Sequence, residues 1–307
     1  RYSRGYVVNV LSDLKANEEK VYAIVDKEAV PQKCSTRTAR TGLDSAEDLA
    51  KTYAADAAGG SAVSQFGFEN RFFQVKIEEK KGITSVYDKE KGQELITKDA
   101  LYPAFTPIYE VTPVLNDPCD ERRRMGRNRK AVHTKRYVGE MSYVRVLEDG
   151  SVYSRIELGY DLKGLSECAV ILTAFKDTPR IDIDFRFHKA SVWEPENVYL
   201  ALPFTSPGSD DTLWIDKTGA ALRPRIDQLP GSCTDFYLTQ NGAVIDKKDR
   251  SLLLAFKDNP LVMMGDIKAH PIQLMGEEGV ANNDYLYLWL MNNFWETNFK
   301  ASLGGFY

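Results

Sequence analysis

The chain has 307 residues, of which 43% are hydrophobic and 27% charged, with a formal net charge of −4. This length is enough for a large hydrophobic core, and the slightly acidic balance gives no general attraction to nucleic acid or to an anionic membrane surface. No apolar run reaches the roughly 18–20 residues that a membrane-spanning helix needs. Neither nucleic acid nor a membrane is therefore an expected partner.

The predicted elements begin with two short valine-rich strands, over residues 5–11 and 21–25, separated by polar turns. Residues 36–62 are instead rich in Ala, Asp, Thr and Gly, and Ser45 is a suitable N-cap for one or two helical turns. We therefore predict a small β segment over residues 1–35, and a linker or surface loop with room for a short helix over residues 36–62.

Strand signals follow one another at short intervals in the rest of the chain. The clearest lies over residues 180–188, where Ile181, Ile183 and Phe185 alternate with charged residues. The proline-containing stretch after residue 103 is expected to be irregular. Other strands are predicted over residues 66–77, 83–88, 143–147, 152–160, 169–175, 198–202, 212–216, 243–245, 252–256, 261–264 and 285–291. Closely spaced strands without a convincing helix predict an all-β fold, a large antiparallel β sandwich over residues 63–307.

Cysteine and histidine usage argues against a metal site in this chain. The four cysteines are far apart and form no CxxC pair, and the three histidines are also scattered. Structural zinc sites need clustered ligands, so none is predicted here, and no cofactor is expected in the chain itself. Scattered thiols also suit a reducing compartment, which favours the cytoplasm, although two long-range disulfides would fit the same count.

No catalytic apparatus is predicted from motifs. The sequence has no GxSxG, HExxH, GxGxxG or P-loop pattern. Asp182 and Asp184 lie two residues apart on one predicted strand, so both carboxylates point to the same face, as a glycosidase pair would. Arg180 and Arg186 lie on that face too, and a solvated salt-bridge face explains the four charges more simply.

Two charged loops are candidate contact surfaces. Residues 121–130 hold six basic side chains without interleaved aromatic residues, which favours an exposed loop or a docking surface for an acidic partner domain over a nucleic-acid site. In residues 223–231, two prolines stiffen the chain around Arg225, Asp227 and Gln228. These three residues are candidates for a domain interface, and a stiff surface connection is the alternative.

The densest group of candidate ligand-binding residues follows the last predicted strand. Residues 292–299 combine amides, a carboxylate and an indole, and Gly304 and Gly305 then allow a sharp turn. Amides bond to hydroxyl groups and an aromatic ring accepts the apolar face of a sugar, so a polyhydroxylated ligand is predicted here. The alternative is that Asn and Thr cap the strand while Trp295 fills the core. The candidate residues are Asn292, Asn293, Trp295, Glu296 and Asn298.

Several stretches also carry a family pattern in order. They are residues 5–12, 68–73, 82–89, 93–95, 178–184, 191–196 and 292–299, followed by Gly304 and Gly305. Together they resemble the C-terminal β-domain of family 38 glycoside hydrolases, the α-mannosidases. The resemblance implies a galactose-mutarotase-like β sandwich, preceded by a small β segment and continuing with more strands beyond Tyr307. The linker at residues 36–62 matches nothing in that pattern.

The family hydrolyses α-mannosides with retention, using a zinc ion and an aspartate nucleophile that both belong to a preceding α/β barrel. No residue of this chain matches the nucleophile, the acid or a zinc ligand. The resemblance therefore implies an accessory domain that packs on its own N-terminal catalytic domain and completes one wall of a cleft for an α-mannoside-like carbohydrate. A free-standing carbohydrate-binding module and an aldose epimerase remain the alternatives, the latter needing a carboxylate and histidines in one cleft.

Overall fold

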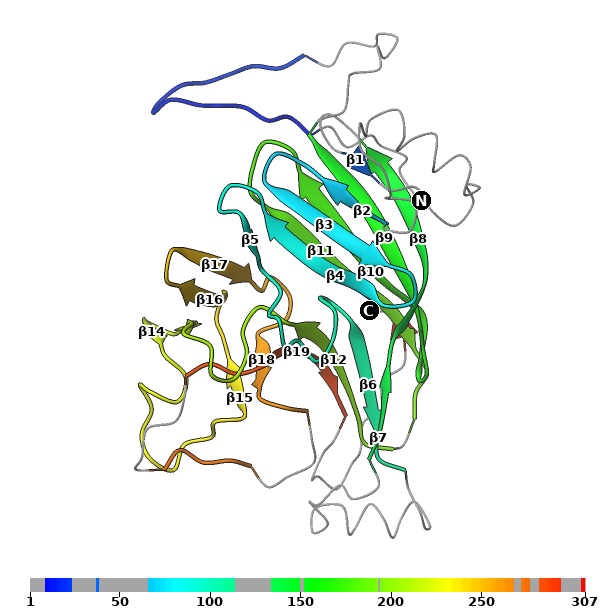
Figure 1. Cartoon of the computed structure of the whole chain (residues 1–307), viewed down its shortest axis with the longest axis vertical. Coiled ribbons are helices and arrows are strands. Elements are labelled where there is room, and N and C mark those ends of the chain that lie inside the picture. Colours follow the sequence, from blue (N-terminus) through cyan, green and yellow to red (C-terminus); the bar gives the residue numbers. More distant parts are fainter. Residues whose placement is uncertain are drawn as a thin grey trace.

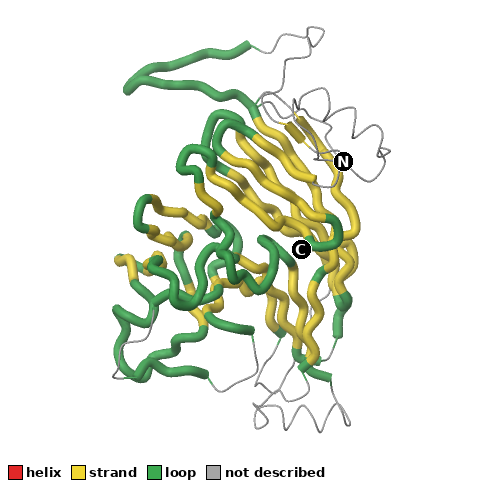
Figure 2. The backbone as a smooth tube through the Cα atoms, in the orientation of Figure 1, coloured by secondary structure: helices red, strands yellow, loops and turns green. Residues whose placement is uncertain are grey.

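The computed structural model describes residues 9–23, 37–38, 66–113, 134–149, 152–192, 194–267, 272–276, 282–293 and 305–306. Within these ranges all regular secondary structure is β-strand, as Figure 2 shows, and the strands form four sheets. The main ladders are antiparallel. The predicted all-β fold with antiparallel sheets is confirmed. The described residues include no helix long and apolar enough to cross a membrane.

Two five-stranded sheets face each other in the upper part of Figure 1. The first has the order β1 (Arg37–Thr38), β2 (Phe66–Glu69), β3 (Phe73–Glu78), β4 (Gly82–Asp88), β5 (Gln93–Glu94). The second has the order β20 (Gly305–Phe306), β11 (Ile181–Lys189), β10 (Leu165–Phe175), β9 (Tyr153–Leu162), β8 (Glu140–Asp149). Strands β8 to β11 confirm the four strands predicted between residues 143 and 188.

The remaining strands form two further sheets. A six-stranded sheet has the order β15 (Phe236–Leu238), β18 (Leu261–Met264), β19 (Leu286–Asn292), β12 (Glu196–Leu202), β6 (Pro107–Val111), β7 (Lys135–Val138). A four-stranded sheet, on the left of Figure 1, has the order β14 (Ala220–Leu222), β13 (Thr212–Lys217), β16 (Gly242–Lys247), β17 (Arg250–Ala255). The expectation of an irregular chain after residue 103 was thus wrong for residues 107–111, which form β6.

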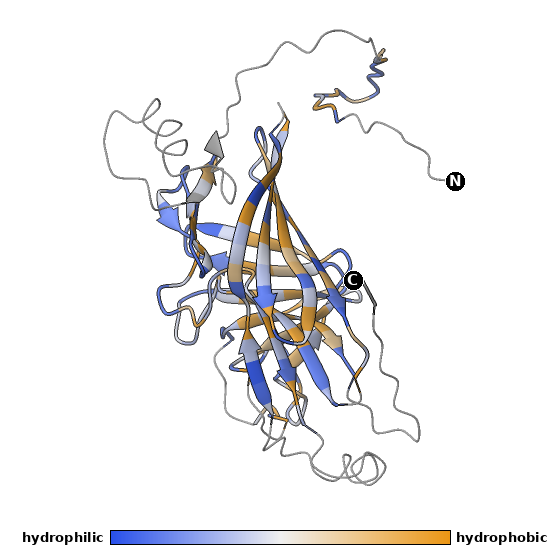
Figure 3. Cartoon of the chain, turned by 90° about the vertical axis from the view of Figure 1, so that its right-hand side faces the viewer, coloured by the Kyte–Doolittle hydropathy of each residue, from blue (hydrophilic) through white to orange (hydrophobic). Residues whose placement is uncertain are grey.

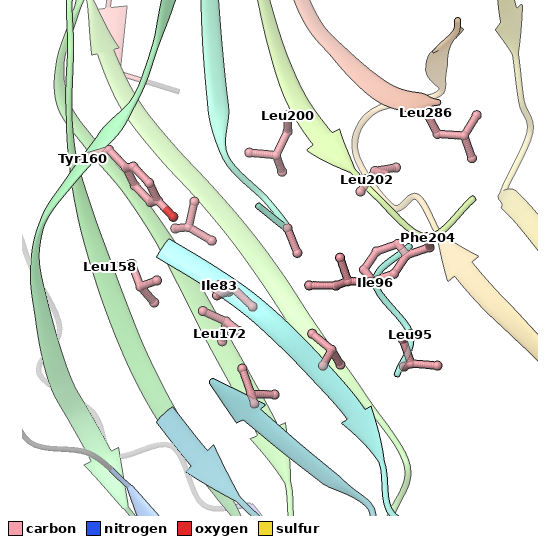
Figure 4. Close-up of a cluster of buried hydrophobic side chains, with 14 of the residues drawn as sticks. Ile83, Leu95, Ile96, Leu158, Tyr160, Leu172, Leu200, Leu202, Phe204 and Leu286 are labelled. Carbon is pink, nitrogen blue, oxygen red and sulfur yellow. The ribbon is translucent and has the colours of Figure 1, made fainter. Parts of the chain in front are cut away.

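One hydrophobic core joins the sheets. Leu158 and Leu172 from one side of the sandwich and Ile83 from the other are at most 1% exposed, and Figure 4 shows them pointing into a common interior. The same cluster includes Leu200 and Leu286, from the six-stranded sheet. Side chains alternate along a strand. The residues next to Leu200 on β12 and next to Leu286 on β19 therefore point to the opposite side of the six-stranded sheet. We call this opposite side the outer face of the six-stranded sheet.

The described part of the N-terminal segment forms an arm instead of paired strands. Residues 9–23 run out and back through a turn at residues 16–17 without strand pairing, and Figure 1 shows the arm standing away from the sheets. The strands predicted over residues 5–11 and 21–25 are therefore not formed where they fall within this range. Asn9 Nδ2 donates a hydrogen bond of 3.1 Å to the hydroxyl of Tyr153 on β9.

Candidate functional site

The outer face of the six-stranded sheet combines aromatic and polar side chains. In β19, Tyr287 and Trp289 alternate with Leu286 and Leu288, so the aromatic side chains point outward while the leucines point into the main core. Tyr199 of β12 lies directly opposite Trp289. The sequence thus places its large aromatic rings on one side of two neighbouring strands.

Trp289 is held by three contacts. Its ring stacks on Tyr199 with centroids 5.6 Å apart and an interplanar angle of 30°, and it makes a T-shaped contact with Phe236 at a centroid distance of 5.8 Å. Its indole nitrogen Nε1 donates a hydrogen bond of 3.1 Å to Asn197 Oδ1. Trp289 stays partly exposed, and Phe236 is 37% exposed. The indole is therefore fixed in orientation without being covered, which is what a stacking platform for a sugar ring requires.

A carboxylate and a guanidinium group lie beside these rings. Arg136 Nε on β7 donates a hydrogen bond of 3.0 Å to Glu110 Oε1 on β6. The Glu110 side chain is 9% exposed and that of Arg136 28%. Burial raises the pKa of Glu110, and the charge and hydrogen bond of Arg136 oppose that rise. Asp266, whose side chain is 47% exposed, lies 4.0 Å from Arg136 Nη1.

Asn292 lies at the end of this face. It is the last residue of β19, it is exposed, and it pairs with Asn197 across the ladder. A β-bulge opposite the step from Val198 to Tyr199 shifts the register of β19 by one residue, so Asn292 comes to lie beside Asn197 on the outer side. This amide is the one member of the predicted sugar-binding group that the structure describes on the outer face.

Asn293 turns the other way and is buried, with 6% of its surface exposed. Its Nδ2 donates hydrogen bonds to Glu196 Oε2 (2.9 Å) and to the carbonyl of Glu194 (3.0 Å), and its Oδ1 accepts from the backbone nitrogen of Glu196 (2.6 Å). Glu196 also forms an ion pair with Lys189 and accepts a hydrogen bond from the hydroxyl of Tyr109. Asn293 therefore anchors the end of β19 to a buried charged network.

The other predicted residues of this group, Trp295, Glu296 and Asn298, lie outside the described residues. So do the basic run at residues 121–130, Cys34, Cys119, His133 and His270. Cys168 and Cys233 are free cysteines.

The predicted interface loop divides into a buried and an exposed part. Arg225 is 5% exposed, and its Nη1 pairs with Asp284 Oδ2 at 2.7 Å. Gln228 Oε1 accepts hydrogen bonds from the backbone nitrogen of Arg225 (2.6 Å) and from the hydroxyl of Tyr237 (2.8 Å). These two side chains hold the loop together from within.

Asp227, by contrast, lies at the surface of the loop. It forms two side-chain hydrogen bonds with Arg223, of 2.8 and 3.0 Å. The side-chain hydrogen bond from Arg223 lowers the pKa of Asp227 to about 2. A carboxylate with this pKa stays ionised at physiological pH.

The carboxylates on β11 form ion pairs, as the sequence indicated. Arg180 Nε and Nη2 donate to Asp182 at 2.6 and 2.8 Å, and Asp184 lies 3.9 Å from Arg155. His188 is the histidine that the structure describes, and its Nδ1 contacts Ser166 Oγ at 2.7 Å. It lies on the same sheet as β11, whereas the carboxylate of Glu110 lies on the six-stranded sheet, so these two groups do not share one cleft as an aldose epimerase would need. In the described ranges no group of three or more His, Cys, Asp or Glu side chains is arranged to hold a metal ion.

Sequence reasoning missed Glu110, Arg136, Asn197 and Trp289. Residues 285–291 were predicted only as a strand, but Tyr285, Tyr287 and Trp289 recur at every second position with leucines between them. That period of two was the signal for an aromatic face. Glu110 and Arg136 meet only because β6 pairs with β7, a contact between distant parts of the chain that no local pattern contains.

Comparisons with known proteins identify no family for this chain. No protein-family model matches the chain, and no curated protein matches it. Among solved structures, an alpha-mannosidase from Enterococcus faecalis V583 is similar, with 11% sequence identity and a TM-score of 0.48. The match covers 77% of this chain and 27% of the mannosidase, so the chain spans roughly a quarter of that enzyme's length. A similarity of this size does not establish a family or a shared activity.

Proposed function

We propose that this chain is an accessory β-domain of a glycoside hydrolase of the α-mannosidase type. Its outer face on the six-stranded sheet, ending at Asn292, forms one wall of a cleft for an α-mannoside-like carbohydrate. The nucleophile and a zinc ion are assigned to a preceding catalytic domain. The order of motifs in the sequence supports the family, and the arrangement of the outer face supports the role.

The observation that carries the proposal is the set of polar groups beside the Trp289 ring. A partly exposed indole of fixed orientation bonds to the amide of Asn197, which pairs with Asn292 across the ladder. Asn197 also lies opposite the Glu110 carboxylate, which accepts a hydrogen bond from the Arg136 guanidinium. Carbohydrates present apolar C–H faces edged by hydroxyl groups, and this combination offers a ring for the first and hydrogen-bond partners for the second. Holding the sugar in this way contributes to catalysis by positioning it.

The loop around Arg225 is assigned to the contact with the catalytic domain. Arg225 and Gln228 fix the loop from inside, and the exposed Arg223–Asp227 pair is the part that reaches a neighbour. A rigid loop loses little conformational entropy on docking, which suits an interface within one protein.

The first test uses the isolated 307-residue chain. It should not hydrolyse an aryl α-mannoside with or without added zinc, and clear zinc-dependent turnover would contradict the accessory role. A free-standing carbohydrate-binding module would use the same face, because Trp289 is partly exposed and Asn292 is exposed. Tight binding of mannose oligosaccharides by the isolated chain, in the micromolar range or better and lost in Trp289→Ala, would favour the module.

The second test uses the parent enzyme that contains the catalytic domain. Trp289→Ala should raise KM about tenfold with a small change in kcat, since stacking contributes up to about 1.5 kcal/mol. Trp214→Ala is the matched control, because Trp214 is also partly exposed but lies on the four-stranded sheet against Arg223. If Trp289→Ala and Trp214→Ala lose the same fraction of activity and the same thermal stability, Trp289 only fills space.

A further inference from the structure

A second candidate binding surface lies on a different sheet. A hollow of about 760 Å³ opens on β8 to β11, and its lining includes Tyr143, Arg145, Glu157, Glu167 and Arg186. Leu158 of β9 and Leu172 of β10 face the sheet that contains β3 and β4. The side chains that line the hollow lie on the opposite face of the β8–β11 sheet, because successive side chains alternate between the two faces. Figure 3 shows hydrophilic and hydrophobic residues alternating along the strands on this side of the molecule. The volume is within the range of about 300–1,000 Å³ that small-ligand sites occupy.

The floor of the hollow is a tyrosine ring lying on a glycine. Tyr143 of β8 is opposite Gly159 of β9, and a Cβ atom at Gly159 would lie only 2.0 Å from Tyr143 Cε1. The ring can therefore lie against the backbone of the sheet because residue 159 has no side chain. Tyr143 remains 41% exposed, which leaves ring surface open to solvent.

Two neighbours fix the orientation of this ring. The Tyr143 hydroxyl donates a hydrogen bond of 2.9 Å to Glu157 Oε1, and the same oxygen accepts from Arg145 Nη2 at 2.5 Å. The Arg145 guanidinium lies 5.8 Å from the ring centroid. Because the side chain is held on two sides, little conformational entropy is lost when a ligand stacks on it.

Two β-bulges frame the same point. Strand β8 carries one extra residue between Met141 and Tyr143, and β10 carries one between Leu165 and Cys168. Glu167, inside the second bulge, has a φ of 53°, which is unfavourable for a residue with a side chain. Both bulges oppose the stretch of β9 around Tyr160. Bulges concentrate next to functional sites, where they redirect side chains, and here they redirect polar groups to the rim of the hollow.

The charges at the rim have both signs. Arg186 of β11, Asp161 of β9 and Glu167 of β10 are exposed and form no ion pair within the described residues. A purely anionic or purely cationic ligand would meet repulsion from part of this rim. Hydroxyl groups both donate and accept hydrogen bonds, so a neutral ligand rich in hydroxyl groups can use the guanidinium and the carboxylates together.

We propose that this hollow binds a sugar unit of a neutral oligosaccharide, with its apolar face stacked on Tyr143 and its hydroxyl groups bonded to Arg186, Asp161 and Glu167. The inference goes beyond the proposed function, because the surface belongs to the β8–β11 sheet and shares no residue with the outer face of the six-stranded sheet. The site would hold a part of a long glycan that is distant from the sugar in the proposed cleft.

The test measures binding by the 307-residue chain with saturation-transfer NMR and calorimetry. The probes are mannotetraose and cellotetraose, which are neutral, and tetragalacturonate, which is anionic. At least one neutral tetrasaccharide should bind, and Tyr143→Ala should weaken that binding about tenfold. Tyr143→Phe keeps the ring and should change the affinity less than threefold, whereas Arg186→Ala should weaken it several-fold.

Tyr153→Ala is the matched control, because this tyrosine also lies on the β8–β11 sheet and its hydroxyl bonds to a glutamate, Glu148 Oε2, at 3.1 Å. It should leave the affinity unchanged, because Tyr153 does not line the hollow. Circular dichroism confirms that each variant is folded. The proposal is overturned if neither neutral sugar binds, if folded Tyr143→Ala binds as well as the original chain, or if tetragalacturonate binds more tightly than both.

Discussion

Replacing Lys189 by methionine tests the buried network that anchors the end of β19. Lys189 and Glu196 form an ion pair in which each side chain is 1% exposed. Methionine keeps most of the apolar stem but removes the ammonium group, so the Glu196 carboxylate remains buried with Tyr109 and Asn293 as its donors. Breaking one side of such a buried pair costs about 3–5 kcal/mol.

The lower end of that range is expected here, because two neutral donors remain. A loss of about 3 kcal/mol changes the ratio of folded to unfolded chain by about two orders of magnitude. The matched control is Lys81→Met, since Lys81 pairs with Glu78 at 2.6 Å but the two side chains are 65% and 38% exposed. Exposed pairs of this kind contribute about 0–1 kcal/mol.

Urea unfolding followed by tryptophan fluorescence measures both variants, with the slope of each transition checked for constancy. The double variant Lys189→Met with Glu196→Gln should recover part of the loss, because it removes the stranded carboxylate. If Lys189→Met costs no more than Lys81→Met, the network does not hold the end of β19.

Three further substitutions test other buried groups. The Tyr160 hydroxyl has no hydrogen-bond partner within the described residues, so Tyr160→Phe should stabilise the chain by about 1 kcal/mol in urea unfolding, and a loss would refute this. The pKa of Glu110 is higher in the folded chain than in the unfolded chain, so the free energy of unfolding falls as the pH rises from the lower pKa through the higher one. Glu110→Gln should therefore stabilise the chain more at pH 7 than at pH 4. Thermal melts at both pH values check the sign. A Cβ atom at Gly242 would lie 2.1 Å from the Leu254 carbonyl oxygen, so Gly242→Ala should cost about 2 kcal/mol or more in the same urea assay, and an unchanged midpoint would contradict it.

The local part of the fold was predictable from the sequence. Strands β8 to β11 follow one another through short connections, and β11 alternates cleanly, so their existence and their antiparallel pairing both follow from neighbouring residues. Strand β6 was missed because prolines surround it. Pro107 is nevertheless the first residue of that strand, a position where the missing N–H does not interrupt the ladder.

The candidate site was predictable only at its end. Asn292 follows an obvious strand, and its amide stood out in the sequence. The partners of Trp289 come from β12 and β15, and Glu110 meets Arg136 across a pairing of β6 with β7. Such meetings depend on the order of strands in the six-stranded sheet, and that order is fixed by tertiary packing between segments far apart in the chain.

The order of the six-stranded sheet also has a consequence during synthesis. Strand β12 lies between β6 and β19, and β19 begins only at Leu286, more than eighty residues after β12 ends. Until the ribosome has released that segment, one edge of β12 has no neighbour, and an open edge of this kind invites pairing with other chains. Nascent chains that stop short of residue 286 should therefore aggregate or engage chaperones, whereas chains extended a few residues further should not.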